Sequence, residues 1–265
     1  MINPKVSVIT VCFNAENTLQ HTIDSVVRQS YPDIEYIIID GCSDDGTVKI
    51  IKENEQHIAK WLSEPDNGMY DAMNKGIKIS TGDLIAFINA DDWYEDGTVA
   101  SVVSNYQKNP DVDVIHGNEI RRSADGRILW VRRPNRNYKS LIKGMTMFHP
   151  TCFITRRSYN RWGQYDIRYS LAADYELLLR FYIKGAQICY IDKTLANFRV
   201  GGLSWNKWSL LLYECKIIQT KYGLSPLAAN INYVYKSARY ILKILLVKFR
   251  LNWIIGIGMK RGEGS

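Results

Sequence analysis

The sequence predicts an α/β fold with a mostly parallel, Rossmann-like sheet flanked by helices and a helical C-terminal extension. Over the first hundred residues, strand-like and helical patterns alternate, which is typical of a doubly wound sheet with right-handed crossovers. Residues 34–39 are almost all apolar, as in a parallel strand that helices cover on both faces. After residue 202 the pattern is mainly helical.

The N-terminal elements follow in order along the chain. Residues 6–11 are rich in β-branched side chains, which predicts the first strand. Apolar residues then recur at helical spacing over 19–27, with Asn14 or Asn17 as the cap and Pro32 beyond the helix end. The same criteria predict a strand at 34–39, a helix through 48–51, a short strand through 61–62, a helix at 69–79 and a strand at 84–88.

The middle of the chain is less regular. The patterns predict strands at 112–116, 151–154 and 188–191, a hairpin between 128–131 and the residues near 120, a helix at 172–182 and an extended segment at 195–200. Helical patterns then extend to about residue 222 and from about 231 to 255. Because no repeat or low-complexity linker divides the chain, we expect one large domain, residues 1–222, and a basic amphipathic extension, residues 223–265.

Composition limits the class of protein and of partner. Hydrophobic residues make up 46% and charged residues 23% of the chain, which excludes an intrinsically disordered protein. The net charge of +7 indicates an anionic partner, namely nucleotide phosphates, an anionic membrane surface or nucleic acid. The five cysteines contain no CxxC pair, so we expect reduced thiols in a cytoplasmic protein. Neither a secretory signal nor an uncharged apolar run of about 18 residues is present.

Polar clusters follow the predicted strands. They lie at 10–14, 40–47, 64–68 and 89–92, each where a strand ends. Loops at the carboxyl ends of parallel strands meet at one crevice, so we expect a shared polar site there. One such cluster is most often a turn, but turns alone do not explain clusters after all of these strands.

Asp91 and Asp92 directly follow an apolar strand. Adjacent carboxylates at this place suit a divalent cation that also binds phosphate, although the pair alone is equally typical of a turn that caps a helix. The chain has neither a GxGxxG nor a GxxxxGK[ST] phosphate loop. A bound nucleotide would therefore need a metal and basic groups, for which Lys75, Arg199 and the glycines at 201–202 are candidates.

Four strings together resemble the family 2 inverting glycosyltransferases of the GT-A fold. They are TVCFN at 10–14, DGCSDDGT at 40–47, EPDNGMYDAMNKG at 64–76 and NADD at 89–92. The resemblance covers roughly residues 4–205, and the combination is specific although a single DDGT or ADD string is not. It implies a GT-A sheet and transfer of a sugar from a nucleotide-sugar, expected to be a UDP-sugar, with Mg²⁺ or Mn²⁺ as the cofactor.

The resemblance also assigns the donor site. Asn89 stands where the family's DxD motif has its first Asp, so the metal would lie on Asp91 with Asp92 beside it. Thr10, Asn14 and Asp40 would contact the nucleobase and ribose. The full set of implied donor residues is Thr10, Phe13, Asn14, Asp40, Asp66, Asn67, Gly68, Lys75, Asn89, Ala90 and Asp91.

A later carboxylate would act as the base. Residues 171–180 resemble the family's ED-type segment, with Ala173 in place of the usual Glu and Asp174 as the matching base. Glu176 would point away on a helix, and the alternative for Asp174 is an N-cap alone. The diphosphate and acceptor side would include His149, Arg199, Gly201, Gly202 and Ser204, although a lone His is more often structural.

The acceptor is expected to be a polyprenyl-diphosphate-linked saccharide in cell-surface polysaccharide synthesis, because many family members act on such lipids. The irregular segment 118–149 is rich in basic residues, and five of its arginines suit a phosphorylated acceptor, namely Arg121, Arg122, Arg132, Arg133 and Arg136. On the last helix Lys236, Arg239, Lys243 and Arg250 share one arc, which predicts peripheral binding at the cytoplasmic membrane face with the charges toward headgroups.

Other readings remain open. The last helix could instead pack on the catalytic domain or on a second subunit as part of a homo-oligomer. Because the family's first DxD carboxylate and the Glu before Asp174 are absent, a non-catalytic subunit that binds a nucleotide-sugar is the alternative function. A nucleic-acid partner is not expected, because no nucleic-acid motif and no basic stripe with interleaved aromatics is present.

Overall fold

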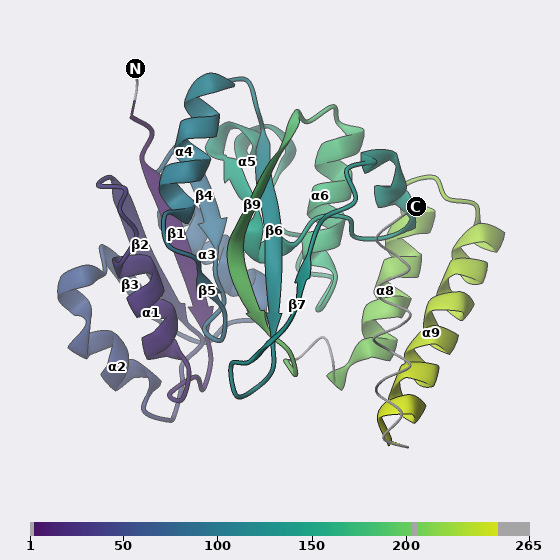
Figure 1. Cartoon of the computed structure of the whole chain (residues 1–265), viewed down its shortest axis with the longest axis horizontal. Helices are drawn as coiled ribbons and strands as arrows, with labels where there is room; N and C mark the ends of the chain where they lie inside the picture. Colours follow the sequence, from purple (N-terminus) through teal and green to yellow (C-terminus); the bar gives the residue numbers. More distant parts are fainter. Residues whose placement is uncertain (1–2, 203–205, 249–265) are drawn as a thin grey trace.

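The computed structural model describes residues 3–202 and 206–248, and in these it shows a central mixed sheet with helices on both faces (Figure 1). The order across the sheet is β3-β2-β1-β4-β8-β6-β9-β5, and β7 pairs with β6. The strands are β1 (Val6–Cys12), β2 (Ile34–Asp40), β3 (Lys60–Ser63), β4 (Leu84–Phe87), β5 (Trp93–Tyr94), β6 (Val114–Arg122), β7 (Ile128–Arg132), β8 (Phe153–Thr155) and β9 (Ile188–Arg199).

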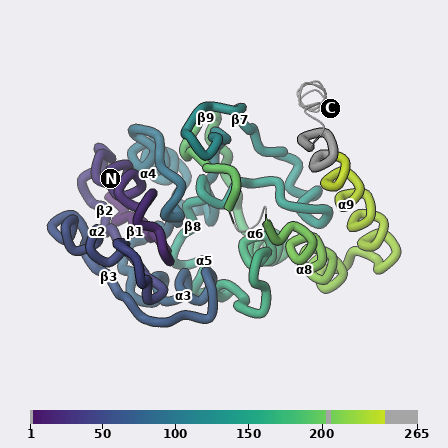
Figure 2. Tube along the Cα trace, turned by 90° about the horizontal axis from the view of Figure 1, so that it is seen from below, coloured from purple at the N-terminus to yellow at the C-terminus, as the bar shows by residue number. Residues whose placement is uncertain are grey.

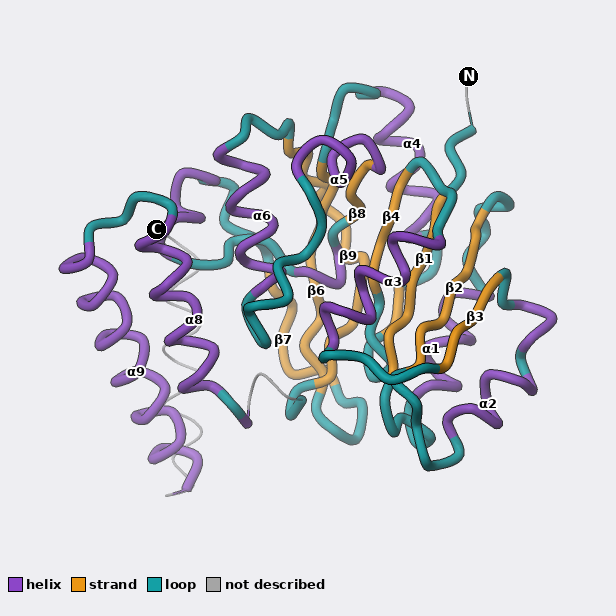
Figure 3. The backbone as a smooth tube through the Cα atoms, turned by 180° about the vertical axis from the view of Figure 1, so that it is seen from behind, coloured by secondary structure: helices purple, strands orange, loops and turns teal. Residues whose placement is uncertain are grey.

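Helices cover the two faces as the sequence predicts. In Figures 1 and 3, α1, α2 and α4 lie on one face and α3, α5 and α6 on the other. The helices are α1 (Leu19–Val27), α2 (Thr47–Glu53), α3 (Met69–Ile79), α4 (Thr98–Lys108), α5 (Arg156–Trp162), α6 (Ala173–Ile183), α8 (Trp208–Lys221) and α9 (Pro226–Lys248), with short 3₁₀ turns η1 (Glu55–His57), η2 (Tyr138–Lys143) and η3 (His149–Thr151).

Burial alternates along the central strands. Ile9 and Ile37 pack with α3 and α6 on one face, whereas Val8 and Ile38 pack with α1 and α4 on the other. All of these side chains have no exposed surface, and burying each one contributes roughly 1.5–3 kcal/mol relative to exposure. The two apolar clusters therefore fix the sheet that presents the strand-end loops.

The N-terminal part of the sheet is parallel. Cys12 lies opposite Asp40 in the β1–β2 ladder, and Asp40 lies opposite Ser63 in the β2–β3 ladder. The three strands therefore end at one level. The loops that follow them gather at one edge of the sheet, at the bottom of Figure 3. The predicted order of strands and helices is confirmed here.

The other half of the sheet is mixed. β8 pairs antiparallel with both β4 and β6, and β6 pairs parallel with β9. The expected hairpin is confirmed, because Ile120 lies opposite Val131 in the β6–β7 ladder. The prediction of two separate extended segments at 188–191 and 195–200 is wrong: they form the single strand β9, whose ladder with β6 is irregular around Asn118.

The C-terminal helices α8 and α9 lie side by side at the end of the molecule away from β3 (Figures 1 and 2). Ile218 of α8 is fully buried in the core cluster that contains α6. The helix predicted at 231–255 begins earlier, at Pro226, and its predicted end lies outside the described residues. In the described part of the chain, no helix is both long and apolar enough to cross a membrane.

Candidate active site

The loops that follow β1 and β2 are tied together by hydrogen bonds. The Asn14 N–H donates to Ser43 Oγ at 2.8 Å, and the Asp44 N–H donates to Asn14 Oδ1 at 3.1 Å. The Ala15 N–H donates to Thr47 Oγ1 at 2.7 Å. Asn14 has a φ of 49°, in the left-handed region that few non-glycine residues adopt. These bonds fix the two predicted donor loops relative to each other.

Two predicted donor residues, Thr10 and Asp40, are fully buried. The Asp40 carboxylate accepts hydrogen bonds from the Ser43 N–H at 3.0 Å and from Ser63 Oγ at 2.6 Å. The Thr10 and Tyr36 hydroxyls lie 3.1 Å apart. Both side chains support the loops in this structure, and their contacts with a nucleotide stay a prediction. Sequence reasoning missed Ser63, although the β2–β3 pairing places it opposite Asp40.

Phe13, Gly41 and Asp66 form one wall at the ends of β1, β2 and β3. The Phe13 side chain is 64% exposed, which is high for a large aromatic residue. A Cβ added at Gly41 would lie 2.6 Å from Asp66 Oδ2 and 3.4 Å from the Phe13 ring. A side chain at position 41 would therefore require the Asp66 carboxylate to move. The exposed ring offers an apolar face on which a nucleobase can stack.

The loop between β3 and α3 is held by its own carboxylates. Asp66 Oδ1 accepts a hydrogen bond from the Gly68 N–H at 2.8 Å, and Asp71 Oδ2 accepts one from the Asn67 N–H at 2.9 Å. Gly68 has a φ of 106°, a conformation that favours glycine. The predicted residues Asp66, Asn67 and Gly68 thus form a turn that opens α3.

Lys75 lies on α3 beneath this turn. Its ammonium group donates to the Pro65 carbonyl at 2.7 Å and pairs with the Glu64 carboxylate at 2.9 Å. Its side chain therefore holds the loop in this structure. The expectation that Lys75 neutralises a donor phosphate stays a prediction.

Asp91 and Asp92 are adjacent but differ in exposure. Asp92 is 1% exposed, and its carboxylate accepts hydrogen bonds from the Arg199 N–H at 3.0 Å and from Asn89 Nδ2 at 3.4 Å. Burial and the neighbouring Asp91 raise the pKa of Asp92 well above its ordinary value. Asp91 is partly exposed, and burial also raises its pKa. Asp92 thus holds the loop, whereas Asp91 remains accessible to a ligand.

The end of β9 lies beside Asp91. A Cβ added at Gly202 would lie 3.7 Å from Asp91 Oδ2. The Arg199 guanidinium donates to the Ala124 carbonyl at 2.9 Å and lies 5.4 Å from the Trp93 ring. The predicted diphosphate-side residues Arg199, Gly201 and Gly202 therefore come next to the Asp91 loop. Ser204 lies outside the described residues.

The Asp91 loop suits a divalent cation that a diphosphate shares. Among the described residues, Asn89 Oδ1 and Arg199 Nε are buried without a hydrogen-bond partner, and Ala90 between Asn89 and Asp91 is buried. Within the described ranges, no group of three or more His, Cys, Asp or Glu side chains could hold a metal. Mg²⁺-type sites in nucleotide enzymes commonly use one or two carboxylates and complete their shell with substrate phosphates. Asp91 fits that pattern, and the contact of Asn89 with a ribose hydroxyl stays a prediction.

Asp174 lies in the first turn of α6 and is half-buried. Its Oδ1 accepts hydrogen bonds from the Tyr70 hydroxyl at 3.1 Å and from the Tyr175 N–H at 2.7 Å. The positive end of the helix dipole favours a carboxylate at this place. The carboxylate therefore bonds to the first turn of its own helix and also faces Tyr70, which sequence reasoning had not singled out.

An aromatic cluster links Asp174 to the Asp91 loop. Tyr70 stacks on Tyr165 with centroids 5.4 Å apart, and Tyr165 packs against Phe87 at 5.6 Å. Phe87 is the last residue of β4, and Ile88 separates it from the Asn89–Asp92 loop. The same packed aromatic residues therefore contact both the segment before Asp91 and the Asp174 carboxylate, even though 83 positions separate Asp91 from Asp174 in sequence.

His149 belongs to the same cluster. Its Nε2 lies 2.7 Å from the Tyr165 hydroxyl, and its ring stacks on Phe87. Burial lowers the pKa of His149 below its ordinary value, which favours the neutral imidazole at pH 7. The structural role of His149 is thus visible, and an acceptor-side role stays a prediction.

The Glu176 carboxylate takes part in a separate network of ion pairs. Its buried carboxylate pairs with Arg180 at 3.1 Å and with Lys221 at 3.1 Å, and it accepts a hydrogen bond from the Tyr222 hydroxyl. Glu176 therefore ties α6 to the end of α8. This geometry agrees with the preference for Asp174 as the base.

The predicted arginine-rich acceptor segment is only partly available. Arg121 and Arg132 pair with the buried Glu119 at 2.6 and 3.4 Å, and Arg122 donates to Asn197 at 2.8 Å. Three of the five arginines therefore have internal partners, on β6 for Arg121 and Arg132 and on β9 for Arg122, and the acceptor role of the segment stays a prediction. Arg133 and Arg136 have exposed side chains.

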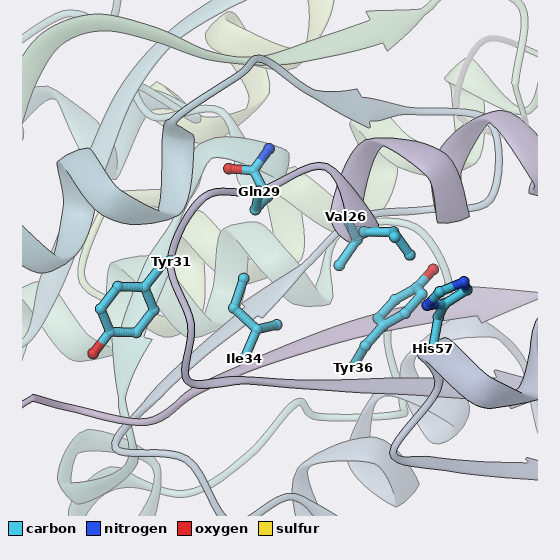
Figure 4. Close-up of a pocket in the computed structure, with 7 residues that line it drawn as sticks. Val26, Gln29, Tyr31, Ile34, Tyr36 and His57 are labelled. Atoms are coloured by element: carbon cyan, nitrogen blue, oxygen red, sulfur yellow. The ribbon is translucent and has the colours of Figure 1, made fainter.

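A cavity of about 190 Å³ adjoins the end of β9. It is lined by Arg121, Phe198, Val200, Gly201, Gly202, Trp208, Leu211, Leu212 and Tyr240. The Trp208 and Tyr240 rings stack with centroids 4.7 Å apart, and the Arg121 guanidinium lies 3.7 Å from the Phe198 centroid. A second cavity of about 170 Å³ lies between α1, β2 and η1, and it contains none of the predicted site residues (Figure 4).

The chain is similar to mycobacterial glycosyltransferases. It is 30% identical over 210 residues to a Mycobacterium bovis protein named PGL/p-HBAD biosynthesis glycosyltransferase. The alignment covers 77% of this chain and 80% of that protein. The chain is 36% identical over 179 residues to an uncharacterized glycosyltransferase of Mycobacterium tuberculosis, with 67% and 68% covered.

Solved structures share the fold. TarS of S. aureus in complex with UDP-GlcNAc aligns with a TM-score of 0.63 and 17% identity, covering 86% of this chain and 70% of that one. The mannosyltransferase PcManGT of Pyrobaculum calidifontis in complex with GDP-Man and Mn²⁺ aligns with a TM-score of 0.65 and 18% identity, covering 89% and 69%. The predicted GT-A fold is thereby confirmed.

The family assignment rests on sequence. The profile described as "Glycosyl transferase family 2" matches residues 7–162, which include the strand-end loops with Phe13, Asp66 and Asp91. The chain therefore belongs to glycosyl transferase family 2, and it is a glycosyltransferase that uses a nucleotide-sugar donor.

Proposed function

We propose that the protein transfers a sugar from a UDP-sugar to an acceptor hydroxyl with inversion at the anomeric carbon. The observation that carries the proposal is the placement of two accessible acids on one scaffold. Asp91 lies at the end of β4, Asp174 lies at the start of α6, and the cluster around Phe87 and Tyr165 joins them.

The donor would lie along the strand ends. The uracil ring would stack on Phe13, a ribose hydroxyl would donate to Asn89 Oδ1, and the diphosphate would lie between Asp91 and the Gly202 loop. A bound Mg²⁺ or Mn²⁺ would neutralise charge that develops on the leaving diphosphate. Asp91 would hold that ion together with phosphate oxygens.

Asp174 would act as the general base. It takes the proton of the acceptor hydroxyl as the oxygen attacks the anomeric carbon on the face opposite the diphosphate. The bond from this carbon to the phosphate oxygen breaks, and the electron pair leaves with UDP. One in-line displacement inverts the configuration and needs no protein nucleophile. The Tyr70 hydroxyl and the Tyr175 N–H hold the carboxylate in place.

A panel of nucleotide-sugars tests this function. We expect UDP release above the uncatalysed rate from one UDP-sugar with Mn²⁺, and loss of that release when EDTA is added. The non-catalytic alternative, a regulatory subunit that binds a nucleotide-sugar, predicts donor binding without turnover for every member of the panel. Equal turnover with and without EDTA would contradict the metal requirement.

The acceptor side would be the cavity beside β9. Its aromatic and aliphatic lining suits the apolar part of a lipid-linked saccharide, and Arg121 with the exposed Arg133 and Arg136 suits its phosphates. A polyprenyl-diphosphate-linked acceptor in cell-surface polysaccharide synthesis has both features. The acceptor loop would then lie within residues 118–149, next to the cavity.

The membrane-facing surface would be apolar. Exposed apolar side chains are present along α9 from Leu227 to Leu242, whereas Lys236 of the predicted basic arc donates to the Lys143 carbonyl at 2.6 Å. Arg239 is exposed, and the side chains of Lys243 and Arg250 lie outside the described residues, so contact of this arc with headgroups stays a prediction. We propose peripheral binding at the cytoplasmic leaflet through the exposed set Leu210, Tyr213, Ile217, Leu227, Ile231, Val234, Tyr235, Ile241 and Leu242.

Vesicle flotation tests the membrane proposal. We expect the full chain to float with anionic vesicles at low salt, and the double variant Ile231→Glu/Val234→Glu to stay in the soluble fraction because two charges enter the apolar stripe. The matched control Arg239→Glu changes an exposed charge on the same helix and should reduce flotation only slightly. Recovery of the full chain in the soluble fraction would reject membrane binding, and a dimer that the double variant abolishes would favour a second subunit on this face.

A further inference from the structure

Glu214 of α8 reaches the segment that leads into α6. Its carboxylate accepts hydrogen bonds from the backbone N–H groups of Ser170 at 2.8 Å, Leu171 at 2.9 Å and Ala172 at 2.9 Å. The side chain is 6% exposed. Three backbone donors in succession therefore converge on one buried carboxylate, 42 to 44 positions away in sequence.

The start of α6 needs such a partner. The residue at its N-cap is Ala172, which has no side-chain acceptor, and no local side chain caps the helix there. Buried N–H groups without an acceptor are costly. A carboxylate near the positive end of a helix is favourable, and charge-assisted hydrogen bonds are strong. Glu214 thus supplies from α8 the acceptor that the segment before α6 lacks.

Asp174 follows this anchored segment directly. Ala172 is the last residue that Glu214 holds, and Asp174 is two residues further on. Among the described residues, the Asp174 carboxylate accepts two hydrogen bonds, from Tyr70 and Tyr175. The Glu214 contact thus holds the backbone that leads into the turn carrying Asp174.

We propose that Glu214 is a positioning residue for catalysis: it anchors residues 170–172 and so sets where Asp174 meets the acceptor hydroxyl. The inference rests on the proposed role of Asp174 as the base. It makes α8 a part of the catalytic apparatus, not only a helix that packs on the sheet. A misplacement of about 1 Å at such a group can cost about a hundredfold in rate.

Glu176 offers a matched control. It is also a buried glutamate in the α6–α8 interface, but its carboxylate pairs with Arg180, Lys221 and Tyr222 and forms no hydrogen bond with 170–172 or Asp174. Its backbone N–H donates to the Ala172 carbonyl at 2.9 Å within the helix, and a side-chain substitution leaves that bond in place. Glu176→Gln therefore makes the same chemical change in the same interface without releasing the Asp174 segment.

The test compares Glu214→Gln, Glu214→Ala and Glu176→Gln in the full chain. UDP release from the most active donor of the panel gives kcat, and titration with UDP and Mn²⁺ gives nucleotide affinity. We expect kcat to fall about tenfold in Glu214→Gln, which keeps one acceptor oxygen, and about a hundredfold in Glu214→Ala. UDP affinity should stay within about twofold, and Glu176→Gln should keep kcat near the wild-type value even if its melting temperature falls.

Hydrogen exchange supplies a readout that does not need activity. The amides of 170–172 should exchange faster in Glu214→Gln than in the wild type, and unchanged exchange would overturn the anchoring itself. Faster exchange with wild-type kcat, or an equal kcat loss in Glu176→Gln, would overturn the positioning role. If Asp174→Asn turns over at the wild-type rate, the proposed base is wrong, and that result is distinct from a failure confined to Glu214.

Discussion

Asp174→Asn is expected to lower kcat by about a thousandfold, because general-base catalysis typically contributes about a hundredfold to ten thousandfold. The amide oxygen can still accept hydrogen bonds from the Tyr70 hydroxyl and the Tyr175 N–H, so the helix start should keep its shape. Affinity for UDP with Mn²⁺ should change by less than about twofold. Turnover of the best donor and calorimetric titration with UDP measure the two quantities.

Asp166→Asn is the matched control for this prediction. Asp166 is a carboxylate in the segment before α6, but it pairs with Arg168 at 2.6 Å and with Lys221 at 3.7 Å. Its loss should leave kcat nearly unchanged. A wild-type rate in Asp174→Asn would mean that the carboxylate only caps α6, which is the alternative that the sequence left open.

Asp91→Asn is expected to abolish the Mn²⁺ dependence of UDP binding and to lower turnover by about a hundredfold or more. The reason is that the accessible carboxylate of the loop is lost, and with it the charge that holds a cation against the diphosphate. Titration with UDP in the presence and absence of Mn²⁺, together with the donor assay, measures the effect.

Asp92→Asn provides the neighbouring comparison. Asp92 is buried, and the amide oxygen of Asn can still accept a hydrogen bond from the Arg199 N–H. This variant should lower the melting temperature more than it changes the Mn²⁺ dependence of UDP binding. If Asp92→Asn lost that dependence and Asp91→Asn kept it, the assignment of the metal to Asp91 would be reversed.

Local patterns were sufficient to predict which loops gather at the carboxyl ends of the parallel strands. Strand-end clusters predicted the gathering of the Phe13, Asp66 and Asp91 loops, because parallel strands that end at one level bring their loops together. The prediction of α3 at 69–79 was correct to the residue. The bounds of α3 depend on residues close together in sequence, and the gathering of the loops follows from the rule that the carboxyl ends of parallel strands lie at one edge of the sheet.

Long-range pairings were not readable from the sequence. Glu214 carries no motif, and its partners at 170–172 are backbone groups that any sequence provides. The pairing of β6 with β9 brought Arg122 to Asn197 and Arg121 to the Phe198 ring. On α9, spacing showed a basic arc and an apolar arc, but only tertiary packing decided that Lys236 faces the domain.

A structure of the complex with UDP and Mn²⁺ would locate the nucleotide and so decide whether the strand-end loops form the donor site. We expect the uracil ring against Phe13, a ribose hydroxyl at Asn89 Oδ1, and the diphosphate with its metal between Asp91 and Gly202. Asp174 should lie on the acceptor side of the diphosphate. A nucleotide bound elsewhere, for example in the cavity lined by Tyr31, Tyr36 and His57 (Figure 4), or a metal with no contact to Asp91, would contradict this expectation.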